Sequence, residues 1–183
     1  FKMPTTTSTA AASGVNPAAP TSADAFLFVA SIGFCEVTVN GVAASEAVLS
    51  PSISYLPSRV LYRTYDVAAL LRPGKNNTIG LWASAGWADY MSFQWAVPGQ
   101  FPHAPLVMAE LHVANTVVAA TDSTWQCRKS TTSRIGNWGD GGFGGDHVDT
   151  TLDVPGWDTP EVAALSTAQM AAEAAAAAAV GST

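Results

Sequence analysis

The feature that most constrains this chain is an Asn-Gly pair, Asn40 and Gly41, placed directly after a segment of alternating side chains. Residues 35–39 (CEVTV) alternate between apolar and polar types. A period of two is typical of a β-strand with one buried face. Asn-Gly is the strongest short signal for a two-residue hairpin, because both central residues of a type I′ turn need a positive φ. We therefore predict antiparallel β structure at this point.

Further strand-like segments recur along residues 26–158, and turn signals separate them. Asp66 is predicted to cap a short helical turn over 67–71, and turns are predicted at 73–77 and 115–116. Seven or more short strands without a long helix predict an all-β fold, a β-sandwich. The remaining predicted strands lie at 26–30, 59–65, 78–84, 105–113, 117–120 and 125–129.

Two compositionally biased flanks border the predicted module, which we assign to residues 26–160. The first flank is 1–25, in which residues 4–25 are small, polar and proline-rich. Such a segment cannot bury enough surface to fold, so a disordered linker is predicted. The second flank, 161–183, contains an alanine run and follows Pro160, a favourable first helical residue. We therefore predict an alanine-rich helical tail.

Charged residues make up only 12% of the 183 residues, against roughly 25% in typical soluble domains. The formal net charge is −6, and eight residues are Lys or Arg. A nucleic-acid-binding surface needs clustered basic side chains, so the composition excludes that class of partner. No apolar run is long enough to span a membrane, and no leader with a basic start and an apolar core follows Phe1. Neither a membrane partner nor a signal peptide is predicted.

The sequence lacks the short motifs of common catalytic sites, so no catalytic residue is predicted. It contains no Gly-x-Ser-x-Gly, no Gly-x-x-x-x-Gly-Lys-Ser/Thr and no His-Glu-x-x-His. Cys35 and Cys127 are too few for a zinc site of four cysteines. We interpret them as two small buried residues, and a single disulfide between them stays open. His112, in a predicted strand, is interpreted as a packing or surface residue.

A Gly- and Asp-rich segment, 136–149, is the first candidate site, and we predict it to be a loop. Its residues Trp138, Asp140 and Asp146 suit a sugar, because aromatic rings stack on the C–H faces of pyranoses and carboxylates accept hydrogen bonds from hydroxyls. Together with Asp149, these carboxylates also make a calcium ion possible, although the Asp-x-Asp-x-Asp-Gly spacing of a calcium loop is absent. The alternative is a surface loop whose aromatic residues pack back onto the sandwich.

A second aromatic group follows the strand at 78–84 and gives the remaining sugar-binding candidates. Trp87, Asp89 and Tyr90 begin the loop after that strand, and Trp95 lies further along it. Binding residues concentrate in such loops. Trp82 lies within the strand and is predicted to be a core residue. Packing is the alternative for the loop residues too, because large aromatic side chains dominate protein cores.

Several motifs occur in a recognisable order along residues 26–160. They are 36–41 (EVTVNG), 49–51 (LSP), 62–67 (YRTYDV), 70–76 (LLRPGKN), 86–87 (GW), 105–111 (PLVMAEL), 121–125 (TDSTW) and 155–160 (PGWDTP). In this order they resemble the N-terminal β-sandwich module of α-L-rhamnosidases, glycoside hydrolase family 78. The opening residues 1–3 are similar to the first strand of that module, so residues 1–25 are expected to hold a remnant of it. Over 138–149 the sequence departs from the usual loop of the family.

The resemblance implies a jelly-roll fold, similar to galactose-binding domains, that precedes a catalytic (α/α)6 barrel. Because the catalytic carboxylates of the family belong to the barrel, it implies that this chain is non-catalytic by itself. The implied partners are a rhamnose-containing glycan or another carbohydrate and the barrel of the same polypeptide. No cofactor is expected, except that some modules of this kind bind rhamnose with calcium.

Three functions follow as hypotheses from the sequence. The chain is an accessory module that supports or contacts the substrate site of an α-L-rhamnosidase-like hydrolase, an independent lectin-like carbohydrate-binding module, or a structural scaffold of a β-galactosidase-like enzyme. Exposed aromatic side chains gathered in one concave patch would favour sugar binding over a purely structural role. The glycosylation sequon at Asn76 is compatible with secretion.

Overall fold

The computed structural model of the chain describes residues 24–56, 58–89, 105–137 and 142–163. Within these ranges it contains nine β-strands and three short 3-10 helices. The strands are β1 (Ala25–Ile32), β2 (Phe34–Val39), β3 (Val42–Ala43), β4 (Tyr62–Asp66), β5 (Ile79–Ser84), β6 (Leu106–Val113), β7 (Thr116–Ala120), β8 (Thr132–Asn137) and β9 (Gly142–Val148). The 3-10 helices are η1 (Ala68–Leu70), η2 (Gly86–Asp89) and η3 (Thr150–Leu152).

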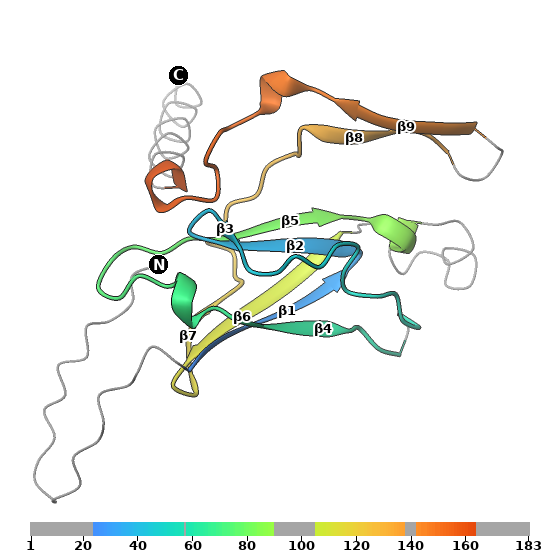
Figure 1. Cartoon of the computed structure of the whole chain (residues 1–183). Coiled ribbons are helices and arrows are strands. Elements are labelled where there is room, and N and C mark those ends of the chain that lie inside the picture. Colours follow the sequence, from blue (N-terminus) through green and yellow to red (C-terminus); the bar gives the residue numbers. More distant parts are fainter. Residues whose placement is uncertain (1–23, 57, 90–104, 138–141, 164–183) are drawn as a thin grey trace, which may run out of the picture.

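The strands form two packed antiparallel sheets and a separate hairpin. One sheet has the order β4-β1-β6-β7, the other has the order β3-β2-β5, and β8 pairs only with β9. Figure 1 shows three layers, with the β3-β2-β5 sheet between the larger sheet and the β8–β9 hairpin. The predicted all-β sandwich is therefore confirmed.

The core lies between the two sheets and follows the alternation of the strands. Leu27 and Val29 of β1 are buried, as are Val37 and Val39 of β2 and Leu111 of β6. The residues between them on the same strands are more exposed, as expected for strands that bury one face. Further core residues come from several elements and include Ala25, Cys35, Tyr65, Val67, Leu71 and Ala109.

The Asn-Gly turn has the predicted geometry. Asn40 and Gly41 both have positive φ, 55° and 80°, and Val39 pairs with Val42 across the turn. The β6–β7 hairpin turns one residue earlier than predicted, because Ala114 and Asn115 are the residues with positive φ. Local turn chemistry therefore predicts one turn fully and the other to within one residue.

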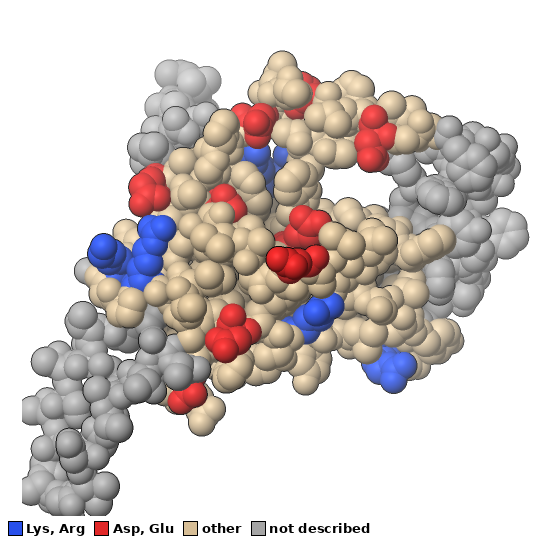
Figure 2. All heavy atoms as spheres, in the orientation of Figure 1, with Lys and Arg blue, Asp and Glu red and all other residues tan. Residues whose placement is uncertain are grey.

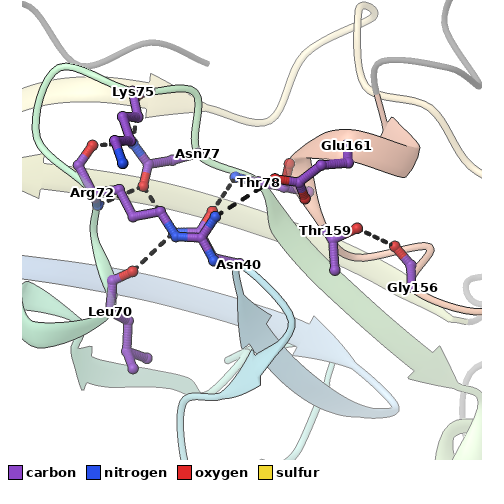
Figure 3. A network of polar contacts seen from close by, with 9 residues as sticks. All are labelled: Asn40, Leu70, Arg72, Lys75, Asn77, Thr78, Gly156, Thr159 and Glu161. Carbon is purple, nitrogen blue, oxygen red and sulfur yellow. Dashed lines mark hydrogen bonds and ion pairs between the residues drawn. The ribbon is translucent and has the colours of Figure 1, made fainter.

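Two buried asparagines tie the first hairpin to the loop before β5 (Figure 3). The amide Nδ2 of Asn40 donates to Leu70 O and to Oδ1 of Asn77, both at 2.8 Å. Asn40 Oδ1 accepts from the backbone N–H of Thr78 at 2.9 Å. Asn77 is only 1% exposed, and its amide also bonds the backbone of Arg72. Buried amides require such partners, so this network stabilises the loop in one conformation.

The segment after η3 packs on the outer face of the middle sheet. A Cβ at Gly80 would lie 2.7 Å from Asp158 Cβ and 3.0 Å from the Trp157 ring, so only glycine fits here. The helix predicted to begin at Pro160 is confirmed for residues 160–163. Glu161 in its first turn lies 3.8 Å from the guanidinium of Arg72, which links this segment to the loop of the asparagine network (Figure 3).

Two secondary-structure predictions were wrong. The strand predicted at 125–129 is irregular, because Asp122 forms a tight turn and the indole Nε1 of Trp125 donates to Ala120 O. Part of the predicted loop 136–149 is instead the β8–β9 hairpin, which glycine-rich composition concealed. The predicted linker up to residue 23 and the predicted tail beyond residue 163 lie outside the described residues.

Candidate functional site

Trp87 lies at a shallow hollow at one end of the sandwich. Three segments line it: the corner between β1 and β2, the stretch 51–56 together with Leu61, and η2. Trp87 is 46% exposed, whereas the next residue, Ala88, is buried and anchors the short helix. The sequence left open whether this loop tryptophan packs into the core or lies exposed, and the structure places it half exposed at a shallow concave surface.

Close backbone packing positions the Trp87 side chain. Gly86 has a φ of 49°, and a Cβ there would lie 2.7 Å from the Phe34 ring. Gly33 has a φ of 102° and approaches Ser84 O so closely that any side chain would clash. Both positions require glycine, because L-residues with a side chain rarely adopt these conformations. The two glycines allow the β1–β2 corner and η2 to meet, and this contact places Trp87 at the hollow.

The loop that forms the opposite wall is fixed through Ser50. Its carbonyl accepts the backbone N–H of Cys35 at 2.7 Å, and its hydroxyl accepts from Arg63 Nη1 at 2.8 Å. The Ser50–Pro51 peptide bond is cis. These bonds tie the loop both to β2 of the middle sheet and to β4 of the larger sheet.

The hollow suits surface contact rather than enclosure of a ligand. It encloses about 10 Å³, which is room for about one water molecule. Ile53 and Trp87 contribute exposed apolar surface to it, and Ser52 and Ser54 lie beside them. A ring stacked flat on the indole is compatible with this shape, whereas a buried sugar is not.

Trp82 was predicted to be a core residue, and this prediction was wrong. It is 47% exposed, because it lies on the outer face of β5, opposite Glu36 of β2. Figure 2 shows an opening between the β8–β9 hairpin and the rest of the described molecule. Since the hairpin lies over the outer face of the β3-β2-β5 sheet (Figure 1), Trp82 and Glu36 face the side of the sheet on which this opening lies. The sequence does not show the register of β5 on β2, and this register decides which side chains of β5 face the core. It turns Leu81 toward the core and Trp82 away from it.

The structure describes only part of the predicted sugar-binding set. Besides Trp87, it places Asp146 in β9, exposed and opposite Arg134 of β8. Asp89 is the last residue of η2, and its side chain is outside the described part. These residues belong to different elements, and no described contact joins Trp87 to Asp146. The other predicted candidates lie outside the described residues: Tyr90, Trp95, Trp138 and Asp140.

Two carboxylates with perturbed pKa serve as turn caps. The pKa of Asp122 is lowered by hydrogen bonds from the side chain and backbone of Thr124, and that of Asp149 is lowered by the same bonds from Thr151. A glycosidase acid needs the opposite, a raised pKa. Neither residue therefore has the character of a general acid.

The described residues lack the features of a metal site and of a membrane-spanning helix. These residues include no group of three or more His, Cys, Asp or Glu side chains that could hold a metal ion. Of the carboxylates considered for calcium, Asp146 and Asp149 are described, and Asp140 lies outside the described residues. In the described part of the chain, no helix is both long and apolar enough to cross a membrane.

The two cysteines are free thiols in different environments. Cys35 is buried, and burial raises the pKa of its thiol to about 11, with a smaller contribution from the charge of Glu36. Cys127 is exposed. The interpretation as two buried residues is thus confirmed for Cys35 and wrong for Cys127. His112, predicted to be a packing or surface residue, packs edge-on against Phe28 at 4.9 Å and contacts Glu110.

Comparison with known proteins identifies the module to which these features belong. An α-L-rhamnosidase of Formosa agariphila is 28% identical over 145 residues, which is 75% of this chain and 15% of that protein. An α-L-rhamnosidase of Streptomyces avermitilis is 30% identical over 87 residues, 48% of this chain and 8% of that protein. The chain therefore spans less than a sixth of the length of either relative.

A solved structure supports the same fold. The α-L-rhamnosidase from Dictyoglumus thermophilum superposes with a TM-score of 0.58 and 23% identity, over 74% of this chain and 14% of that one. The family model described as "Alpha-L-rhamnosidase N-terminal domain" matches residues 21–180, nearly the whole chain. This chain therefore belongs to the family of α-L-rhamnosidase N-terminal domains.

Proposed function

We propose that this chain is a non-catalytic accessory module of an α-L-rhamnosidase-like glycoside hydrolase. It supports or contacts the sugar site of a catalytic (α/α)6 barrel in the same polypeptide. The observation that carries the proposal is the match of residues 21–180 to a family of N-terminal domains, in relatives of which this chain spans 15% or less. The relatives are α-L-rhamnosidases, and most of their length lies outside the matched module.

Two described carboxylates, Asp122 and Asp149, have the opposite character to the general acid of a glycosidase. Glycoside hydrolysis needs two carboxyl groups about 5 to 10 Å apart across the sugar, one of them with a raised pKa. Asp122 and Asp149 have lowered pKa values and already accept two hydrogen bonds each from Thr124 and Thr151. Such groups stabilise turns and are poor proton donors.

The test is hydrolysis of an aryl α-L-rhamnoside by the isolated chain. We expect release of the aryl group at the rate of the buffer blank, whereas the intact polypeptide with its barrel turns the substrate over. Clear turnover by the isolated chain, abolished by substitution of a carboxylate in the same preparation, would contradict the proposal.

Independent carbohydrate binding is the second candidate, and the exposure of two tryptophans favours it. Trp87 at the hollow is 46% exposed and Trp82 on the middle sheet is 47% exposed, so each offers an indole face for stacking. Calorimetry with L-rhamnose at millimolar concentration tests this candidate. Saturable heat that is lost in Trp87→Ala or Trp82→Ala but kept in Trp125→Phe supports it. Trp125 is the matched control, because its indole Nε1 is bonded to Ala120 O. The absence of heat for the unsubstituted chain refutes it.

A further inference from the structure

The outer face of the β4-β1-β6-β7 sheet is unusually apolar for a surface. The register places Ala30 between Tyr62 of β4 and Met108 of β6, and Ile32 beside Leu106. Tyr62 is 65% exposed, Met108 63% and Leu106 48%. Together with Phe28, these residues form what we call the outer apolar face: Phe28, Ala30, Ile32, Tyr62, Leu106 and Met108.

Strand β1 shows why this face is not an ordinary solvent surface. Its inward residues are buried, and its outward residues, Phe26, Phe28, Ala30 and Ile32, are all apolar. In an antiparallel sheet with one solvent-exposed face, each strand normally alternates between apolar and polar residues. The only polar residue of β1 is Ser31, which is buried on the inner side. The strand therefore has the composition of one that is covered on both faces.

The described part of the chain covers only one face of this sheet. The β3-β2-β5 sheet lies against the inner face, and the β8–β9 hairpin lies beyond it on the far side (Figure 1). On the outer face, Phe28 contacts Tyr62 at 6.2 Å and His112 at 4.9 Å between ring centroids. The aromatic rings are thus partly packed together, while Tyr62 and Met108 stay largely exposed.

The outer apolar face has the anatomy of an interface. Polar side chains lie at one end of it, since Thr64 of β4 and Glu110 of β6 flank Phe28 in its own row, and His112 lies beside Phe26 in the next row. An apolar centre with a polar rim is typical of protein–protein contacts. A sugar platform would need exposed hydrogen-bonding groups among the rings, whereas Ala30, Met108 and Leu106 fill the centre here.

We infer that the outer apolar face is the surface on which the neighbouring catalytic domain of the same polypeptide docks. This inference rests on the proposed function. The length of the relatives argues for this occupant: 85% or more of each α-L-rhamnosidase lies outside the matched module, so such a module has a large body of protein beside it. Docking of that body would cover the second face of β1.

Hydroxyl-radical footprinting read by mass spectrometry tests this surface. Tyr62 and Met108 report on the outer apolar face, and Trp82 on the opposite side of the sandwich is the internal reference. In the isolated chain all three residues are expected to be labelled. In the intact polypeptide, labelling of Tyr62 and Met108 should fall at least about fivefold, because the core of an interface is desolvated. Labelling of Trp82 should change by less than about twofold.

A pair of exposed substitutions separates docking from folding. Met108→Glu is expected to leave the melting temperature of the isolated chain unchanged within about 2 °C, because the side chain is exposed. In the intact polypeptide it should restore labelling of Tyr62. Val148→Glu, at an exposed site of the hairpin, is the matched control and should leave Tyr62 protected.

Each contrary outcome identifies a different error. Equal labelling of Tyr62 in the isolated chain and the intact polypeptide overturns the docking surface but leaves the proposed function standing. If the native protein runs as the 18.9 kDa chain alone, the proposed function and the docking inference both fall. A dimer in sedimentation velocity that Met108→Glu dissociates would make a second copy the occupant. Protection of Tyr62 by L-rhamnose would make the face a sugar platform. Either result overturns the inference.

Discussion

The sandwich and the β8–β9 hairpin are both built from antiparallel strand pairs, yet they differ in how much apolar surface they bury. Leu27, Val39 and Leu111 are fully buried between two sheets. In the hairpin, Ile135 and Val148 are about half exposed, and each strand pairs only with the other. An isolated two-stranded hairpin is marginally stable in water. Strand pairing is therefore common to both regions, and burial distinguishes them.

The same difference explains where sequence reasoning succeeded. The strand before Asn40 was predicted because its alternation and its turn are both local signals. The hairpin was missed because its glycines and aspartates favour turns, and only pairing with a partner strand makes such residues extended. A strand that buries one face shows an alternating pattern in the sequence. A strand that is extended only because it pairs with a neighbour shows no such pattern.

The sequence could name candidate side chains but could not decide their exposure. Trp87 follows a strand end, which made it a candidate, yet packing stayed the alternative until the structure showed it half exposed. Trp82 was misassigned because a tryptophan in a strand faces the core or the solvent according to register, and register depends on distant strands. Gly86 and Gly33, which position Trp87, contact Phe34 and Ser84 in ways that no local pattern encodes.

The largest expected effect contrasts one core residue with one hairpin residue. Leu27→Ala should lower the free energy of unfolding by about 3 to 4 kcal/mol, because it leaves a cavity between the sheets. Ile135→Ala should change it by less than about 0.5 kcal/mol. Urea denaturation followed by tryptophan fluorescence measures both. Equal losses in the two variants would show that the hairpin is part of the same cooperative core.

The second prediction compares a buried polar residue of the asparagine network, Asn77, with its exposed neighbour, Asn76. Asn77→Leu should lower the free energy of unfolding by about 3 kcal/mol. The substitution removes the buried acceptor of the Asn40 amide and of the Arg72 N–H, and leaves both donors without it. Asn76→Leu, at the exposed neighbour, is the matched control and should cost less than about 0.5 kcal/mol. The same denaturation experiment reads both variants. A small loss for Asn77→Leu would mean that water replaces the lost bonds.

Gly80 tests the contact by which the closing segment attaches to the middle sheet. Gly80→Ala should lower the free energy of unfolding by about 2 kcal/mol, because the new Cβ would lie too close to Thr38 Oγ1 and Asp158. In a Trp157→Ala background the cost should shrink, since one of the obstructing groups is gone. A double-mutant cycle from thermal melts measures the coupling. Strict additivity of the two substitutions would contradict the contact.

The smallest expected effect is a pH dependence carried by the buried thiol. Because the pKa of Cys35 is raised to about 11 in the folded chain, the unfolded chain loses its thiol proton first as pH rises above 9.0, the ordinary pKa of a cysteine thiol. Stability should therefore fall between about pH 9 and pH 11, by roughly 1 to 2 kcal/mol. Burial also raises the pKa of Tyr65, which acts in the same direction.

Two cysteine variants isolate this pH dependence. Cys35→Ala should flatten the fall in stability above pH 9, and the remaining slope is assigned to Tyr65. Cys127→Ala, at the exposed thiol, should leave the profile unchanged. Urea midpoints measured at several pH values provide the comparison. An unchanged profile in Cys35→Ala would show that the thiol does not titrate as its burial requires.

The buried asparagines also restrict how this module can change in evolution. Four backbone positions between Leu70 and Thr78 bond the side chains of Asn40 and Asn77. Inserting or deleting one residue there would shift these groups and leave buried amides unpaired. Residues 45–49, by contrast, are all exposed. Related modules are therefore expected to differ in length near residues 45–49 and to keep the length of the segment from Leu70 to Thr78.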